Sequence, residues 1–262
     1  MTDEPSPTKR ALDLLKVWNA GGKGEDPVDP ELLCNEVINK QSDGDTLTIM
    51  RDRFDGQFDG MMQFNPASRK GIAIINKSVS SIGRINFTTF HEIYHFLGHR
   101  NMQKSFSCSG RDLSDYKRMP LEVEANKFAS HILVPRQIVR KSCGLDFKID
   151  HVRELAHRLN ASVEAVAYAW MEVSQRPLAF VKAQSGIIEM AFPNDQARRH
   201  QVFIERDREL PSDSITSQSI EDGRELCGEV SEGVWSKKFP AFESSYLGTD
   251  SWSYSFVEFI ID

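Results

Sequence analysis

Residues 85–99 read INFTTFHEIYHFLGH. The apolar side chains of this stretch recur every three or four residues, which predicts a helix from about residue 85 to residue 97. These side chains are Phe87, Phe90, Ile93, Tyr94 and Leu97. On such a helix His91 and His95 lie one above the other, with about 6 Å between their Cα atoms. Two imidazole nitrogens can therefore reach one ion at the ~2.1 Å that zinc requires.

Glu92 completes the pattern His-Glu-x-x-His. Because it adjoins the first histidine, its carboxylate can reach a water on the metal without binding the metal itself. In that position a carboxylate serves as the general base that activates the water. Zinc (Zn2+) is the expected metal, and manganese (Mn2+) is the alternative that the same nitrogen and oxygen donors allow.

A catalytic zinc site needs a third protein ligand, and the helix predicted over residues 121–133 is the obvious source. The apolar face of this helix is made by Ala125, Phe128, Ala129 and Ile132. Glu122 shares that face, whereas Glu124 is rotated about 200° away at 100° per residue. Asn126, one turn after Glu122, can hydrogen-bond a ligand. Glu122 is the favoured third ligand, with Glu124 and His99 as alternatives.

The rest of the first half predicts an α+β fold. Thr46–Met50, Phe58–Phe64 and Gly71–Ile75 are β-rich runs separated by turn residues, and they predict a small antiparallel sheet. Residues 100–118 show no clear period and are expected to form a loop.

Beyond Pro135 the predicted secondary structure is first helical and then rich in strands. Residues 136–175 have helical periodicity, and strand patterns begin at residue 178 with a hairpin to residue 192. Ser212–Glu221 is polar and is expected to be a loop, and Trp252–Ile261 is expected to be a strand. The chain is therefore predicted to have three parts, namely a domain with the metal site over 1–135, a helix-turn-helix-like segment over 136–176 and a C-terminal α+β domain over 177–262.

The motifs around both helices resemble one known family. Residues 87–99 fit the pattern FTxxHEIxHFLGH, and residues 122–135 fit the pattern ExEANxFAxxILxP. These patterns resemble the ImmA/IrrE family of zinc peptidases, and the resemblance covers about residues 45–135. Phe90 departs from the family, which usually has Ala at that position.

The resemblance implies a zincin-like metallopeptidase domain in which His91, His95 and Glu122 bind zinc and Glu92 activates the water. Members of the family cleave helix-turn-helix repressors or trigger their loss, and the radiation-response, IrrE-like branch thereby switches on DNA-damage genes. The layout of the whole chain resembles that branch, whose C-terminal domain is GAF-like and regulatory. A tetrahedral intermediate also needs a further donor, for which His131, Tyr94 and Tyr116 are candidates.

The helix-turn-helix-like segment raises direct DNA binding as an alternative. Leu155 to Val166 have the spacing of this motif, and Ser162 can cap the second helix. That second helix carries no cation for phosphates or base edges, so a role in packing or partner docking is favoured. Arg153, His157 and Arg158 on the first helix are the best argument for DNA.

Composition excludes several classes of protein. The 262 residues include 32 basic and 38 acidic side chains, for a net charge of −6, so a general coating of nucleic-acid phosphates is not expected. No run approaches the roughly 18–20 apolar residues of a membrane span, and residues 1–7 lack the pattern of a secretory signal. The four cysteines are far apart, which fits a reducing cytoplasm. Cys108 is a minor candidate for a thiolate that occupies the open position of zinc.

The motif predicts a cytoplasmic zinc-dependent endopeptidase, and the family resemblance implies that it cleaves a helix-turn-helix transcriptional repressor and derepresses stress or DNA-damage response genes. The alternative is a non-proteolytic, metal-containing regulatory protein that binds a repressor or DNA.

Overall fold

The computed structural model of the chain describes residues 5–24, 27–53, 58–78, 81–103, 105–108 and 120–261. Within these residues the fold is α+β with two sheets, as the sequence predicts. The chain divides into two units, which are described separately. Unit 1 comprises Met1–Pro135 and Ala156–Ser162, and unit 2 comprises Arg136–Leu155 and Val163–Asp262. The division into three parts stays a prediction.

The sheet of unit 1 has the strand order β1-β3-β2-β4. Its strands are β1 (Thr46–Asp52), β2 (Gly60–Asn65), β3 (Lys70–Asn76) and β4 (Ser105–Cys108). β2 is antiparallel to β3 and β4, but β1 is parallel to β3. The predicted antiparallel sheet is therefore wrong for β1. Alternation of apolar residues indicates a strand and its buried face, whereas strand direction depends on connections that the alternation does not encode.

β4 corrects a second expectation, since it lies within residues 100–118, which were expected to be a loop. Gln63 of β2 pairs with Ser105, and Gly60 pairs with Cys108. Phe106 is buried and Ser105 is exposed. A four-residue strand is too short to show a clear alternation, so its sequence signal is weak. Residues 109–118 lie outside the described part of the chain.

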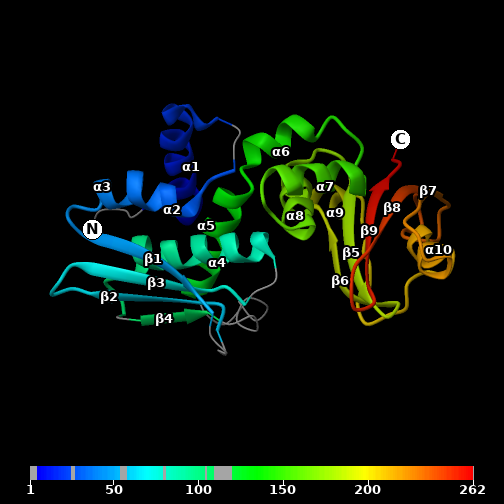
Figure 1. Cartoon of the computed structure of the whole chain (residues 1–262). Coiled ribbons are helices and arrows are strands. Elements are labelled where there is room, and N and C mark those ends of the chain that lie inside the picture. Colours follow the sequence, from blue (N-terminus) through cyan, green and yellow to red (C-terminus); the bar gives the residue numbers. More distant parts are fainter. Residues whose placement is uncertain are drawn as a thin grey trace. The chain divides into compact units, whose positions relative to one another are not determined.

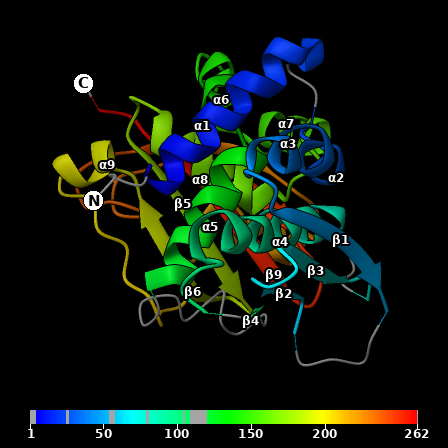
Figure 2. The ribbon, with the colours of Figure 1, turned by 90° about the vertical axis from the view of Figure 1, so that its left-hand side faces the viewer.

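The helices of unit 1 form two groups along the chain. The first group is α1 (Pro7–Trp18), the π-helical turn η1 (Asn19–Lys23), α2 (Pro30–Leu33), the π-helical turn η2 (Cys34–Ile38) and α3 (Asn39–Gln41). The second group is α4 (Ile82–Tyr94), the π-helical turn η3 (His95–His99) and α5 (Pro120–Leu133). Figures 1 and 2 show α4 lying along the sheet of unit 1, with α5 packed against α4.

Local sequence explains where the two central helices begin and end. The Ser81 hydroxyl accepts a hydrogen bond from the backbone N–H of Arg84 and so caps α4. Pro120 starts α5, where a missing N–H costs nothing, and Pro135 follows its end. Buried Phe90 and Ile93 of α4 anchor the helix in the core, so the polar side chains between them are fixed in direction.

Unit 2 is a five-stranded antiparallel sheet with the order β6-β5-β9-β8-β7. Its strands are β5 (Leu178–Gln184), β6 (Ile187–Pro193), β7 (Cys227–Val230), β8 (Ala241–Leu247) and β9 (Trp252–Phe259). The helices outside the sheet are α6 (Arg136–Ser142), α7 (Ile149–Arg158, whose last residues belong to unit 1), α8 (Val163–Val173), α9 (Asp195–Arg199) and α10 (Ile215–Asp222). The predicted hairpin and final strand are confirmed as β5, β6 and β9.

Helix α10 corrects the expectation of a loop over Ser212–Glu221. Ser214 caps this helix, and the buried carboxylate of Glu243 on β8 accepts hydrogen bonds from the backbone N–H groups of Ile215 and Thr216. The indole N–H of Trp235 donates to the same carboxylate at 2.7 Å. The helix is stabilised by this long-range contact, which local composition cannot reveal. None of the helices in the described ranges is both long enough and apolar enough to span a membrane.

Candidate metal centre

Three side chains predicted as metal ligands converge between α4, η3 and α5. His91 lies in the last turn of α4, His95 is the first residue of η3, and Glu122 lies in the first turn of α5. His91 and His95 are fully buried, and Glu122 is 6% exposed. Among the described residues, these three form the group of side chains that could hold a metal ion.

The donor atoms of this group face one another at short distances. Nε2 of His91 lies 2.9 Å from Nε2 of His95 and 2.9 Å from Oε2 of Glu122. Nε2 of His95 lies 3.4 Å from Oε1 of Glu122. A tetrahedral ion with ligands at about 2.0–2.1 Å separates neighbouring donor atoms by roughly 3.4 Å, so the three groups need only small shifts to share one zinc.

The protonation of the group suits a cation. Burial lowers the pKa of His95 to about 4, although Glu122 opposes this shift, so the ring is neutral at pH 7. Burial raises the pKa of Glu122, but the contacts of its carboxylate with the rings of His91 and His95 outweigh this effect and lower the pKa below its usual value. The Oε2 atom of Glu122 is buried and has no aligned hydrogen-bond partner among the described residues. A buried carboxylate that faces two imidazole nitrogens is a donor set that fits a divalent metal.

The other ring nitrogen of His91 has the partner expected from the sequence. Nδ1 of His91 lies 2.9 Å from Oδ1 of Asn126, one turn after Glu122 on α5. With Nδ1–H donating to this oxygen, the lone pair of Nε2 points toward the ion site. Helix α5 therefore supplies both the third ligand candidate and the group that orients the first.

Glu92, the predicted general base, is fully buried beside this group. Neither of its carboxylate oxygens has a hydrogen-bond partner among the described residues. Burial raises the pKa of Glu92 well above its usual value, and the negative charge of Glu122 raises it further. A buried carboxyl without partners is costly and calls for a functional explanation, because structural carboxylates are normally paired.

Gly60 is a site residue that the sequence reading did not single out. It begins β2, where a β-carbon would lie 2.5 Å from Cγ2 of Thr88 and 2.8 Å from Oε1 of Glu92. Asp59 beside it accepts a hydrogen bond from Nε of Arg84 at 3.2 Å, which holds β2 against α4. A glycine at the start of a strand is the available signal for such a close approach.

Replacement of Gly60 by Ala tests this close packing. We expect a loss of about 1–3 kcal/mol in the free energy of unfolding, because Thr88 and Glu92 must both move away from the added methyl. Urea denaturation of the metal-free chain measures the change. Gly21→Ala, whose β-carbon would meet nothing within 4 Å, should change the stability by less than about 0.5 kcal/mol. Equal stability of the two variants would contradict the packing argument.

The alternative ligands, His99 and Glu124, lie beyond His95 and outside the group of converging donor atoms. Nδ1 of His99 lies 2.9 Å from Nδ1 of His95, and Nε2 of His99 lies 3.1 Å from Oε2 of Glu124. His99 and Glu124 therefore contact each other rather than the converging atoms of the site.

Of the three candidates for a further hydrogen-bond donor to the tetrahedral intermediate, the structure describes Tyr94 and His131. Tyr94 packs its ring against Phe128 and His99, and Nδ1 of His131 lies 2.9 Å from the Lys127 carbonyl oxygen. Tyr116 lies outside the described residues, and so does the side chain of Cys108. The role of these donors, and of Cys108 in latency, stays a prediction.

The second helix of the helix-turn-helix-like segment is mostly buried within unit 2. Val166, Ala167, Ala169 and Trp170 of α8 are fully buried, and α8 packs on β5. Arg153 on α7 donates to the Glu225 carboxylate at 2.7 Å and lies 5.1 Å from the ring of Tyr246. These contacts favour packing over DNA reading, because the helix that would enter a groove faces the core.

A match to a known protein family agrees with the metal-binding arrangement of His91, His95 and Glu122. Residues 47–171 match the model of the IrrE N-terminal-like domain (Peptidase_M78). This segment therefore carries an IrrE N-terminal-like domain, and the resemblance inferred from the motifs is confirmed. The match includes His91, His95 and Glu122, whose arrangement fits the site of a zinc metallopeptidase.

Two further comparisons add little. No curated protein matches the chain. Among solved structures the chain is similar to "Crystal Structure of the E.coli DhaR(N)-DhaL complex", with 13% sequence identity and a TM-score of 0.25. The similarity covers 60% of this chain and 49% of that one, so the chain spans about half the length of the protein it matches.

Proposed function

We propose that this chain is a zinc-dependent endopeptidase that cleaves a helix-turn-helix transcriptional repressor and thereby derepresses stress or DNA-damage response genes. The observation that carries the proposal is the convergence of His91, His95 and Glu122, with donor atoms 2.9–3.4 Å apart beside the unpaired carboxyl of Glu92. The IrrE N-terminal-like domain supports a protein substrate.

His91 and His95 through Nε2, and Glu122 through its carboxylate, would hold the metal. When bound, zinc acts as a Lewis acid and lowers the pKa of a water toward 7. An Oε atom of Glu92 takes a proton from the attacking water and delivers it to the nitrogen of the departing amine. Burial of Glu92 and His95 keeps bulk water away, so the carboxylate acts in a medium of low dielectric constant.

The five-stranded antiparallel sheet of unit 2 supports a regulatory, GAF-like role for residues 177–262. Trp235, Tyr254 and Phe256 in this part are buried, as expected for core aromatics. A cytoplasmic location is part of the same proposal and rests on the sequence.

Incubation of the zinc-loaded chain with purified helix-turn-helix repressors from the same genome tests the function. We expect one new N-terminus in the repressor, identified by mass spectrometry, and no new terminus when a chelator is present. An intact repressor in a stable complex with the chain would contradict hydrolysis and favour the non-proteolytic regulator. Salt-dependent retardation of DNA by the chain alone would favour direct DNA binding.

A further inference from the structure

A line of three polar side chains runs from the metal centre toward solvent within unit 1. Nδ1 of His95 faces Nδ1 of His99 at 2.9 Å, and Nε2 of His99 faces Oε2 of Glu124 at 3.1 Å. Both histidines are fully buried, whereas the side chain of Glu124 is 46% exposed. His95 thus differs from His91, whose Nδ1 meets Asn126 directly.

One arrangement of protons satisfies these contacts and leaves His95 able to bind a metal. Binding through Nε2 requires the lone pair of that nitrogen, so the neutral ring of His95 carries its proton on Nδ1. This N–H donates to Nδ1 of His99, which must therefore accept. His99 then carries its own proton on Nε2 and donates it to the carboxylate of Glu124. Every ring nitrogen of the two histidines has a role in this arrangement.

We propose that His99 is a positioning residue that, together with Glu124, holds His95 in the Nδ1–H tautomer and presents its Nε2 to the metal. The inference rests on the proposed metal site. A metal-binding histidine normally donates its second N–H to a carboxylate, a carbonyl or a water. Here a second histidine lies between the ligand and the carboxylate, so the orientation of His95 depends on the tautomer of His99.

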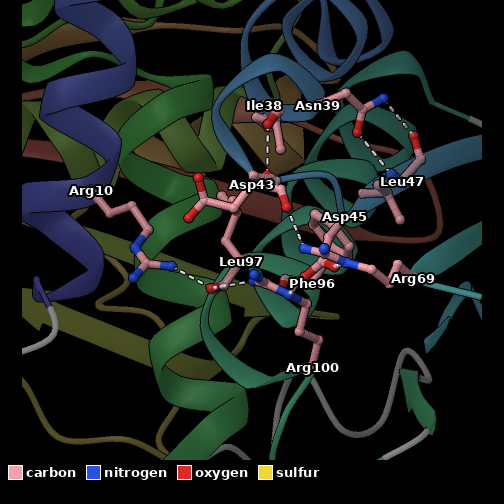
Figure 3. A network of polar contacts seen from close by, with 11 residues as sticks. Arg10, Ile38, Asn39, Asp43, Asp45, Leu47, Arg69, Phe96, Leu97 and Arg100 are labelled. Carbon is pink, nitrogen blue, oxygen red and sulfur yellow. Dashed lines mark hydrogen bonds and ion pairs between the residues drawn. The ribbon is translucent and has the colours of Figure 1, made fainter. Parts of the chain in front are cut away.

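Arginine side chains donate hydrogen bonds to carbonyl groups of η3, the π-helical turn that contains His95 and His99. Figure 3 shows Arg10 and Arg100 meeting at the carbonyl oxygen of Leu97, to which both donate. Arg100 also donates to the carbonyl oxygen of Phe96 at 2.9 Å and to the carboxylate of Asp45 at 2.9 Å. These contacts pair carbonyl groups of η3, a class of turn that occurs frequently at functional sites.

Rings on two sides fix the plane of His99. Its ring centroid lies 5.0 Å from that of Tyr94, nearly perpendicular, and 5.8 Å from that of Phe106. Phe106 also stacks on His95 with a centroid distance of 4.3 Å. Both imidazoles are therefore packed in place, and rotation of either ring would break the line to Glu124.

Nitrogen-15 NMR of the zinc-loaded, histidine-labelled chain tests the tautomers directly. Long-range proton–nitrogen correlations should show His95 protonated on Nδ1 and His99 protonated on Nε2. A proton on Nδ1 of His99 would overturn the proposal, because His95 could then donate nothing to that nitrogen. The measurement uses the wild-type chain, so it does not depend on the folding of a variant.

Two substitutions at position 99 test the effect on metal binding. His99→Leu removes the acceptor, and its affinity for Zn2+, measured by chelator competition, should fall about 10–100-fold. His99→Asn places an amide oxygen near the former Nδ1 and should restore most of that loss. His151→Leu removes a half-buried histidine from unit 2 and should leave the affinity unchanged.

The outcomes distinguish the positioning role of His99 from the presence of the metal site itself. Equal affinity of His99→Leu and the wild type would overturn the positioning role while leaving the metal site intact. Equal weakening of His99→Leu and His99→Asn, with unchanged circular dichroism, would also overturn it, because the acceptor would then not matter. Absence of zinc binding by the wild type would overturn the proposed function itself, and the positioning role with it.

Discussion

Glu92→Gln is expected to retain one zinc ion per chain and to lower the rate of peptide-bond cleavage by about 10²–10⁴-fold. Gln has the same shape as Glu but cannot take a proton from water. Burial and the charge of Glu122 raise the pKa of Glu92 well above its usual value, so the metal-free chain disfavours a charge at this position. The uncharged amide should therefore be tolerated without loss of fold.

Digestion of a peptide library followed by mass spectrometry measures this effect without a known substrate. Glu36→Gln, at a largely exposed carboxylate paired with Lys40, is the matched control and should cleave as the wild type does. Zinc content and circular dichroism are measured on both variants. Cleavage by Glu92→Gln at the rate of the control would rule out the role of Glu92 as general base.

Glu122→Ala is expected to abolish stoichiometric zinc binding. The substitution removes the only carboxylate among the three converging side chains and leaves two imidazoles to hold the cation. The loss of affinity should exceed the 10–100-fold that removal of an outer contact costs. Metal analysis after dialysis against micromolar zinc measures the stoichiometry.

Glu124→Ala is the natural comparison, because it removes a carboxylate two residues along the same helix. Glu124 contacts His99 and not the converging atoms, so this variant should still bind one zinc, with affinity lowered by no more than about tenfold. The opposite order, with Glu124→Ala losing zinc and Glu122→Ala retaining it, would show that the ligand set is wrong.

The convergence of His91, His95 and Glu122 could be predicted from the sequence because it depends on helical spacing. A four-residue separation fixes how His91 and His95 lie, and the shared face of Glu122 and Asn126 follows from the same periodicity. The contact of His99 with Glu124 could not be predicted in this way. It depends on the π-helical turn at residues 95–99 and on how two helices pack.

The parts of the fold that the sequence missed depend on distant contacts. The parallel direction of β1 follows from pairing with β3, and β4 follows from pairing with β2. Helix α10 is polar, and the buried carboxylate of Glu243 stabilises its first turn from β8. Gly60 also became meaningful only when α4 was placed against β2. Local periodicity carries none of this information.

X-ray absorption at the zinc edge of the zinc-loaded chain tests whether His91, His95 and Glu122 hold the metal. We expect one zinc per chain with nitrogen and oxygen neighbours at about 2.0–2.2 Å, including the outer-shell scattering of two imidazoles. Sulfur at about 2.3 Å would instead indicate a cysteine ligand. A spectrum without imidazole scattering would contradict the assignment of His91 and His95 as the residues that hold the metal.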